Sequence, residues 1–260
     1  MVLHWRAVAD YSHGFLIAPL AIYFAWERRK KVKRAAVQPS WWGLVPLFLG
    51  ALALAIGRLG VELTAMRASF VLTLIGLLLL LLGPRVSRVL AFPLLFLFLM
   101  IPLPQSLVNV IAFPLQLIAT DLAVQSLYLF EIPAMREGNI IHLANTQLLV
   151  AEACSGLRSL LALGTLAVVF AYFFRKNTLE RIVIVLSAIP IAILVNAFRV
   201  ALTGWLTHSF GSSAAEGILH TTEGSFTFGL AFAALLFEAW LLQNFWPSRW
   251  SIQATGRSRA

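Results

Sequence analysis

Long blocks of apolar residues alternate with short charged or polar loops along the chain, and this pattern limits the possible folds more than any other feature. The blocks run to roughly 16–25 residues, about the length at which an α-helix crosses the ~30 Å hydrocarbon core of a bilayer. Hydrophobic residues make up 60% of the 260 positions and charged residues only 12%, too few to cover a soluble domain of this length. The sequence therefore predicts a polytopic transmembrane helical bundle of the all-α class.

Seven blocks are predicted to span the membrane, and an eighth to lie at its surface. The first span is the weakest, because Asp10 and His13 precede its apolar part. The block 107–130 is apolar but contains groups such as Gln116 and Asp121, which are costly in lipid unless they are paired. We expect this block to form an interfacial or re-entrant helix. The seven predicted spans are 8–26, 41–59, 68–83, 88–101, 157–174, 182–206 and 224–246.

Basic residues gather in short loops, which sets the expected orientation, because loops rich in Lys and Arg stay in the cytoplasm. The run 27–34 and the loop 175–181 should therefore both be cytoplasmic. Both satisfy the rule only if 107–130 crosses the membrane an even number of times, most simply zero. The segment 131–156 and the loop 207–223 then lie on the outer face, which is the periplasmic face of a bacterial inner membrane.

One integral-membrane domain is expected over 1–246, followed by a disordered cytoplasmic tail over 247–260. The net charge of +9 indicates contact with anionic lipid rather than with nucleic acid, because the basic residues flank apolar blocks. The sequence has no His-Glu-x-x-His pattern of a zinc protease, no Gly-x-Ser-x-Gly and no nucleotide-binding motif. We therefore expect no metal and no other cofactor.

The outer segment is predicted to contain two short extended pieces, Asn139–His142 and Gln147–Val150, around the turn-forming Asn145. It then leads into the one cysteine of the chain, Cys154, which cannot form an internal disulfide. This cysteine is either an inert packing residue or a chemically reactive one.

Cys154 lies where the outer loop turns into a predicted helix, and its neighbours favour the reactive alternative. The N-terminus of a helix lowers the pKa of a thiol and so favours the nucleophilic thiolate. Glu152, Ser155 and Arg158 are polar neighbours at the water boundary, where an inert cysteine would have apolar ones. Gly156 would let the backbone of a substrate approach closely.

Arg199 lies near the outer end of an otherwise apolar helix, with Asn196 one turn earlier. It could anchor the helix end by extending to the lipid headgroups. Alternatively, its guanidinium could hold a carboxylate or a developing oxyanion, oriented by Asn196.

His220 begins the last predicted helix and is either a surface residue or a general acid and base, since its pKa suits proton transfer near neutrality. His13 is predicted on the outer side, where it could help to build the site. Two further histidines are expected in loops without a role: His142 and His208.

Four short segments, in this order along nearly the whole chain, resemble the exosortase/archaeosortase family of membrane cysteine transpeptidases. The resemblance implies that Cys154, Arg199 and His220 occupy the catalytic positions. It also implies supporting roles for Glu152, Ser155, Gly156, Arg158, Asn196, Gly224 and His13. The matching segments are Tyr11-Ser12-His13-Gly14-Phe15, Glu152-Ala153-Cys154-Ser155-Gly156-Leu157-Arg158, Asn196-x-x-Arg199 and His220-x-x-x-Gly224.

The resemblance implies a protease and transpeptidase associated with bacterial exopolysaccharide systems. Its partner would be the C-terminal sorting signal of an exported protein: a Pro-Glu-Pro-like motif, a membrane helix and a basic tail. Cys154 would attack a carbonyl of this signal, Arg199 would stabilise the oxyanion, and His220 would transfer the protons. The alternative is a non-enzymatic membrane component or transporter of polysaccharide export, which would bind phosphate through Arg158 and Arg199.

Overall fold

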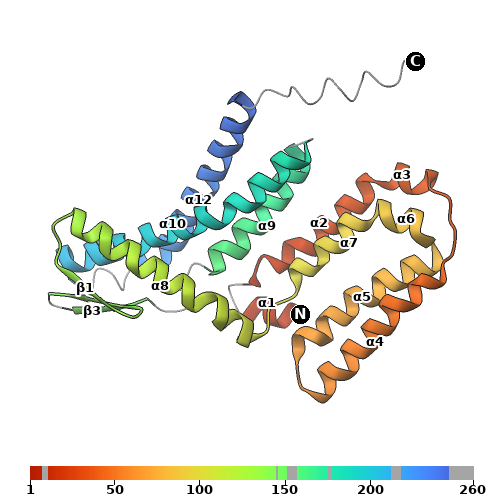
Figure 1. The fold of residues 1–260 in the computed structure, drawn as a ribbon, viewed down its shortest axis with the longest axis horizontal. Coiled ribbons are helices and arrows are strands. Elements are labelled where there is room, and N and C mark those ends of the chain that lie inside the picture. The colour runs from red at the N-terminus through yellow and green to blue at the C-terminus, as the bar shows by residue number, and fades with distance from the viewer. Residues whose placement is uncertain (8–10, 145, 151–156, 175–176, 212–217, 246–260) are drawn as a thin grey trace. The chain divides into compact units, whose positions relative to one another are not determined.

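The computed structural model describes residues 1–7, 11–144, 146–150, 157–174, 177–211 and 218–245, and most of them are helical (Figure 1). The chain falls into two compact units, Met1–Val110 and Ile111–Ala260, and the boundary lies within a long helix, α8 (Gln105–Leu129).

The first unit consists of short and long helices only, in its described part. They are α1 (Val2–Ala7), α2 (Gly14–Glu27), α3 (Arg29–Arg34), the 3-10 turn η2 (Trp41–Gly43), α4 (Leu44–Leu59), α5 (Leu63–Leu81), α6 (Gly83–Val89), α7 (Ala91–Phe96) and the 3-10 turn η3 (Leu97–Met100).

Helices α4 and α5 form a tightly packed hairpin through a row of glycines. Gly43, Gly50 and Gly57 are seven residues apart, so they lie on one side of the η2–α4 segment after every second turn. A Cβ atom added at Gly43 would lie 2.7 Å from the Gly76 carbonyl oxygen, one at Gly50 2.9 Å from Thr73 Oγ1, and one at Gly57 2.7 Å from Met66 Cγ. The two helices therefore approach so closely that no side chain fits between them at these positions.

Two contacts between segments far apart in the sequence mark the two ends of the first unit. At one end, Arg28 Nη1 donates a hydrogen bond of 2.7 Å to the Val89 carbonyl, which brings α3 beside α6 with its exposed Arg88. At the other end, Thr64 Oγ1 donates to the Pro102 carbonyl at 3.1 Å. The run 27–34 and the basic residues of α6 thus share one end, as the alternation of the predicted spans requires. Which side of the membrane this end faces remains a prediction.

In its described part, the second unit contains most of α8, a small antiparallel sheet and three further helices (Figure 1). The strands follow one another in the order β1-β2-β3. The chain is mostly helical, as predicted. The predicted extended pieces correspond to β2 and β3, whereas β1 was not predicted. The elements after α8 are β1 (Ala134–Glu137), β2 (Ile140–Leu143), β3 (Thr146–Leu149), α9 (Leu157–Phe174), α10 (Thr178–Phe210) and α12 (Ile218–Phe245).

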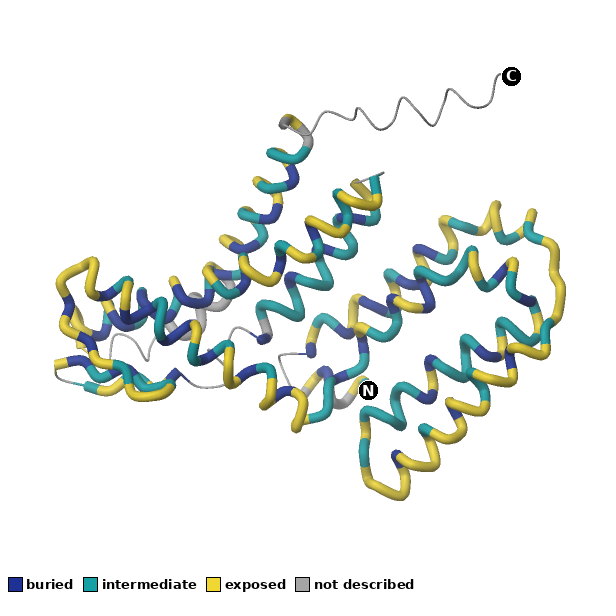
Figure 2. Tube along the Cα trace, viewed as in Figure 1, coloured by how far each residue is buried: buried dark blue, intermediate teal, exposed yellow. Residues whose placement is uncertain are grey.

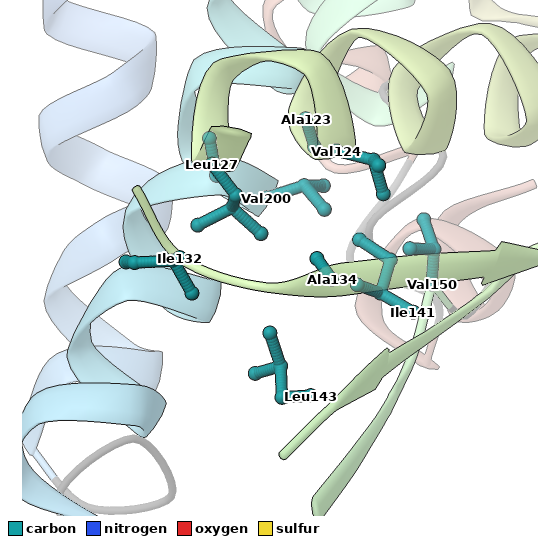
Figure 3. Packing of buried hydrophobic residues seen from close by; sticks show 10 residues of the cluster. Ala123, Val124, Leu127, Ile132, Ala134, Ile141, Leu143, Val150 and Val200 are labelled. Carbon is teal, nitrogen blue, oxygen red and sulfur yellow. The ribbon is translucent and has the colours of Figure 1, made fainter. Parts of the chain in front are cut away.

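One face of the sheet packs against α8 and α10 (Figure 3). Ile141 is fully buried in this cluster, and Val150, just after β3, is 1% exposed. From α8 the cluster includes Leu127, and from α10 it includes Val200 and Ala201. The chain that precedes the Cys154 segment is thereby held against the part of α10 that carries Arg199.

Several polar groups of α8 are paired. In the sequence, such groups leave open whether the block 107–130 crosses the membrane. Asp121 forms an ion pair of 2.8 Å with Arg136 of β1 and accepts a hydrogen bond of 2.8 Å from Gln125. Thr120, which is fully buried, donates from its hydroxyl to the carbonyl of Gln116 at 2.7 Å. Pairing of this kind removes most of the cost of placing polar groups among apolar ones.

Four helices of the described part are long and apolar enough to cross a membrane: Trp41–Leu59, Leu63–Leu81, Gln105–Leu129 and Thr178–Phe210. Gly83–Val89 and Ala91–Met100, which cover the predicted span 88–101, together make a fifth candidate that is bent by 66°. Each predicted span overlaps helical residues, but the number of seven spans is not confirmed. The span 88–101 falls on the bent pair, and Gly14–Glu27, Ser159–Phe174 and Phe226–Leu242 are shorter apolar helices.

The block 107–130 forms one continuous helix, and its length and composition also fit a span. Its interfacial position therefore remains a prediction. Many large apolar residues are exposed, for example Phe48 at 68% and Ile56 at 56% on α4. Exposed segments of the chain are yellow in Figure 2. Such a surface is expected of helices that face lipid rather than water.

Candidate active site

Helices α9, α10 and α12 set the geometry of the candidate site. Helix α10 packs against both α9 and α12, and the view in Figure 1 shows α9 alongside α10. Buried residues four apart meet along the seam: Leu163, Ala167 and Ala171 of α9, Ile184, Ala188 and Ala192 of α10, and Ala231, Leu235 and Ala239 of α12. Small residues at this spacing let helices approach closely.

The polar contact between Ser187 and Glu238, whose side chains are hydrogen-bonded, fixes the register of α10 and α12. Helix α10 runs antiparallel to both neighbours, and each helix rises about 1.5 Å per residue. Counting residues along each helix from the paired positions of the seam, Arg199 is level with the beginning of α9 and with about residue 225 of α12. The backbone of His220 then lies roughly five residues, or about 7.5 Å along the helix axis, beyond that level. One end of the second unit therefore gathers the first turn of α9, Arg199 and the first turn of α12.

Arg199 is held within this end of the unit. It is half-buried, and its Nε atom is shielded from solvent. Asn196, three residues earlier on the same side of α10, is 4% exposed. A guanidinium that extended to the headgroups would leave the protein surface, whereas the base of this one is enclosed. Arg199 thus places a positive charge in a partly enclosed position, where charge interactions are stronger than in bulk water.

A polar clamp, formed by Gln116, Asn139 and Val150, holds the end of β3. The Val150 amide donates to the Asn139 carbonyl at 2.9 Å, and Asn139 Nδ2 donates to the Val150 carbonyl at 3.2 Å. The same Nδ2 lies 3.4 Å from Oε1 of Gln116, which is 5% exposed on α8. Cys154 follows Val150 by four residues, so the clamp fixes the strand that leads to it. The sequence did not indicate this role for Asn139, whose one signal was its place directly after Gly138 at the start of a predicted extended piece.

Several predicted site residues lie outside the described residues. These are Cys154, Glu152, Ser155 and Gly156. His220, Gly224 and Arg158 lie in described helices, and the structure gives the positions of their backbones. What the structure brings together is therefore the set of elements that flank these residues: the end of β3, Arg199 and the first turns of α9 and α12.

The remaining histidines are placed differently from one another. His142 belongs to β2 and contacts the Glu137 carboxylate at 3.0 Å, and His208 lies exposed in the last turn of α10, so the prediction of loop positions for both is wrong. His13 belongs to the first unit, where its ring lies 6.3 Å from that of Tyr11. The glycine after it, Gly14, contacts Trp5 so closely that an added Cβ atom would lie 2.6 Å from the indole.

Within the described part of the chain, no group of three or more His, Cys, Asp or Glu side chains is arranged to hold a metal ion. The enclosed charge at the candidate site is that of the arginine. This arrangement suits binding or stabilising a negative charge beside two helix N-termini, which also attract anions.

Fold and site together define a multi-pass helical membrane protein in which one end of a helix bundle, beside a small sheet, carries an enclosed arginine. The chain belongs to the transmembrane exosortase family, since the family model described as Transmembrane exosortase (Exosortase_EpsH) matches residues 5–237. Membership of this family implies a membrane transpeptidase of the cysteine class. Comparisons with curated proteins and with solved structures gave no match.

Proposed function

We propose that the protein cleaves the C-terminal sorting signal of exported, membrane-tethered proteins through a thioester on Cys154 and transfers them to an acceptor. The site would face the periplasm from the inner membrane, in a system linked to exopolysaccharide. The observation that carries the proposal is the gathering of β3, Arg199 and the first turns of α9 and α12 at one end of the second unit. In the sequence, β3 precedes Cys154 and α9 follows it, and α12 carries the backbone of His220.

The chemistry needs two acyl-transfer steps. In the first, the Cys154 thiolate attacks the scissile carbonyl carbon, the C–N bond breaks, and His220 gives its proton to the departing amine. In the second, His220 takes a proton from the acceptor, which attacks the thioester and releases the thiolate. Arg199 donates hydrogen bonds to the oxyanion that forms in both steps. A half-buried guanidinium suits this role, because its planar group donates several hydrogen bonds in a fixed geometry.

The test is co-expression of the protein with a tagged reporter that ends in a Pro-Glu-Pro-like motif, an apolar helix and a basic tail. Wild type should shorten the reporter, and Cys154→Ala should leave it uncut at an unchanged enzyme level. Cys154→Ser is the matched control, since it keeps the shape of the side chain but replaces the thiolate by a much weaker nucleophile. A reporter shortened equally by the Ala variant would contradict the thioester and favour a non-enzymatic role.

A further inference from the structure

The sheet has two edges, and they differ in how their backbone groups are used. On β1, the carbonyl of Ala134 accepts a hydrogen bond from the hydroxyl of Tyr128, and Arg136 is tied to Asp121. The end of α8 and its connection therefore cover the β1 edge. The β3 edge has no such cover within the residues that the structure describes.

The register of β2 and β3 shows which groups of β3 face outward. The Val150 amide bonds to Asn139, and the Cα partners continue as Leu148 with Ile141 and Thr146 with Leu143. In an antiparallel pair, hydrogen-bonded residues alternate with residues whose N–H and C=O point to the other side. The N–H and C=O groups of Gln147 and Leu149 therefore point away from β2. Both residues are exposed, Leu149 at 58%.

We infer that the β3 edge binds the substrate, with the extended segment of the sorting signal added to the sheet as a fourth strand beside Gln147 and Leu149. This inference rests on the proposed function and names how that substrate is held. Strand addition draws its affinity from main-chain hydrogen bonds and so tolerates varied side chains.

The place of β3 in the chain argues for this occupant. Cys154 lies five residues beyond Leu149, and the clamp at Asn139 holds the end of β3 in position. A segment paired with β3 would therefore run beside the chain that leads to the nucleophile, which is the placement that attack on its backbone needs. Strand edges left open in water invite unwanted pairing, so an open edge at this point favours a transient partner.

A motif with two prolines two residues apart fits such an edge. In a strand, alternate N–H groups face alternate sides, so both prolines, which lack an N–H, can face away from β3. The N–H of the residue between them then faces β3. Prolines at this spacing would leave the hydrogen bonds to β3 intact. They would also prevent a further strand from pairing with the other edge of the bound segment.

The first experiment changes the edge by one backbone group at a time. Leu149→Pro and Gln147→Pro remove N–H groups that the sheet does not use, whereas Leu149→Ala and Gln147→Ala keep them. Reporter cleavage should fall on the order of tenfold or more in the Pro variants, because each loses one hydrogen bond and places a ring in the path of the added strand. The Ala variants keep the N–H groups and should therefore cut faster than the Pro variants. Equal rates for the Pro and Ala variants, at matched protein levels, would overturn the inference.

The second experiment uses the wild-type protein and so does not depend on how the Pro variants fold. A synthetic peptide that spans the extended segment of the reporter competes for cleavage, and single amides are N-methylated in turn. Strand addition predicts that competition is lost at every second residue, including the residue between the prolines, and kept at the others. Loss at all positions or at none would overturn the inference. A wild type that leaves the reporter uncut would instead remove the proposed function itself.

Discussion

At the scale of single residues, a substitution at Arg199 distinguishes a catalytic role from that of an anchor for the helix end. If it served only as an anchor, Lys would replace it, because both side chains have long apolar stems and a terminal charge. If it holds an oxyanion by forked hydrogen bonds, Arg199→Lys keeps the charge but loses the planar geometry. We expect cleavage to fall roughly 10²–10³-fold at an unchanged protein level. Paired immunoblots of enzyme and reporter measure this, and normal cleavage by the Lys variant would reduce Arg199 to an anchor.

His220 and His208 form a matched pair for testing proton transfer. The backbone of His220 lies in the first turn of α12, while His208 is exposed in the last turn of α10. His220→Ala should slow cleavage on the order of 10²–10⁴-fold, the usual range for loss of a general acid or base. His208→Ala should change it little. Cleavage rates of the two variants on the same reporter decide the matter, and similar rates would withdraw the role assigned to His220.

At the scale of elements, the glycine row between α4 and α5 predicts where that hairpin tolerates no side chain. Gly50→Val would push a branched side chain against Thr73 and the Ser69 carbonyl, and overpacking of this kind costs about 1–3 kcal/mol. Ala51→Val places the same side chain one position along, where it is exposed. We expect a lower thermal midpoint in detergent for Gly50→Val alone. Equal midpoints would show that the helices separate more easily than their packing indicates.

The N-terminus of α5 gives a pH-dependent prediction. The Glu62 carboxylate accepts hydrogen bonds from the amides of Ala65 at 2.6 Å and Thr64 at 3.0 Å. The bond from the Ala65 amide is the largest cause that lowers the pKa of Glu62 below its ordinary value, and nearby Arg67 adds to it. A lowered pKa means that the carboxylate stabilises the fold above its ordinary pKa and loses this effect as the pH falls through the lowered one.

The difference in thermal midpoint between wild type and Glu62→Gln should therefore be present at about pH 7 and shrink toward about pH 3. The measurement is a series of melting curves in detergent over that range. A difference that stays constant with pH would mean that the cap does not depend on the charge of Glu62.

At the scale of the whole molecule, the helices follow from the sequence better than the other features. The predicted spans 41–59 and 157–174 have the bounds of Trp41–Leu59 and Leu157–Phe174, because uninterrupted apolar blocks leave few alternatives. Strand β1 was missed since Ala134–Glu137 has no clear alternation, and its pairing depends on the turn at Gly138, which has a φ of +62°. The position of 107–130 could not be read from its composition, because the partners of Gln116 and Asp121 come from the sheet.

The residues of the candidate site also differ in how far the sequence predicts them. Arg199 and Asn196 could be selected from the sequence, since polar side chains are rare in apolar helices. Asn139 could not, because it acts through hydrogen bonds to Val150 that exist only when β2 and β3 pair.

The predicted topology of the second unit can be tested through the one cysteine. In spheroplasts, a membrane-impermeant maleimide should label Cys154 more readily than it labels a Lys176→Cys variant that also carries Cys154→Ala. In the sequence, one position precedes α9 and the other follows it, so they should face opposite sides of the membrane if α9 spans it. Labelling of Cys154 only after permeabilisation would reverse the orientation and require 107–130 to cross the membrane once.

The length of α10 also bears on what the protein can cut. Its 33 residues extend about 50 Å at 1.5 Å per residue, whereas the hydrocarbon core is about 30 Å thick. A helix that begins at the cytoplasmic surface reaches the far boundary of the lipid close to Arg199 and projects its last turns beyond it. The length of α10 would then set the height of the site above the membrane. The bond that is cut would depend on its height above the membrane as well as on the sequence of the substrate. A substrate with a longer spacer between its motif and its membrane helix would present the wrong bond.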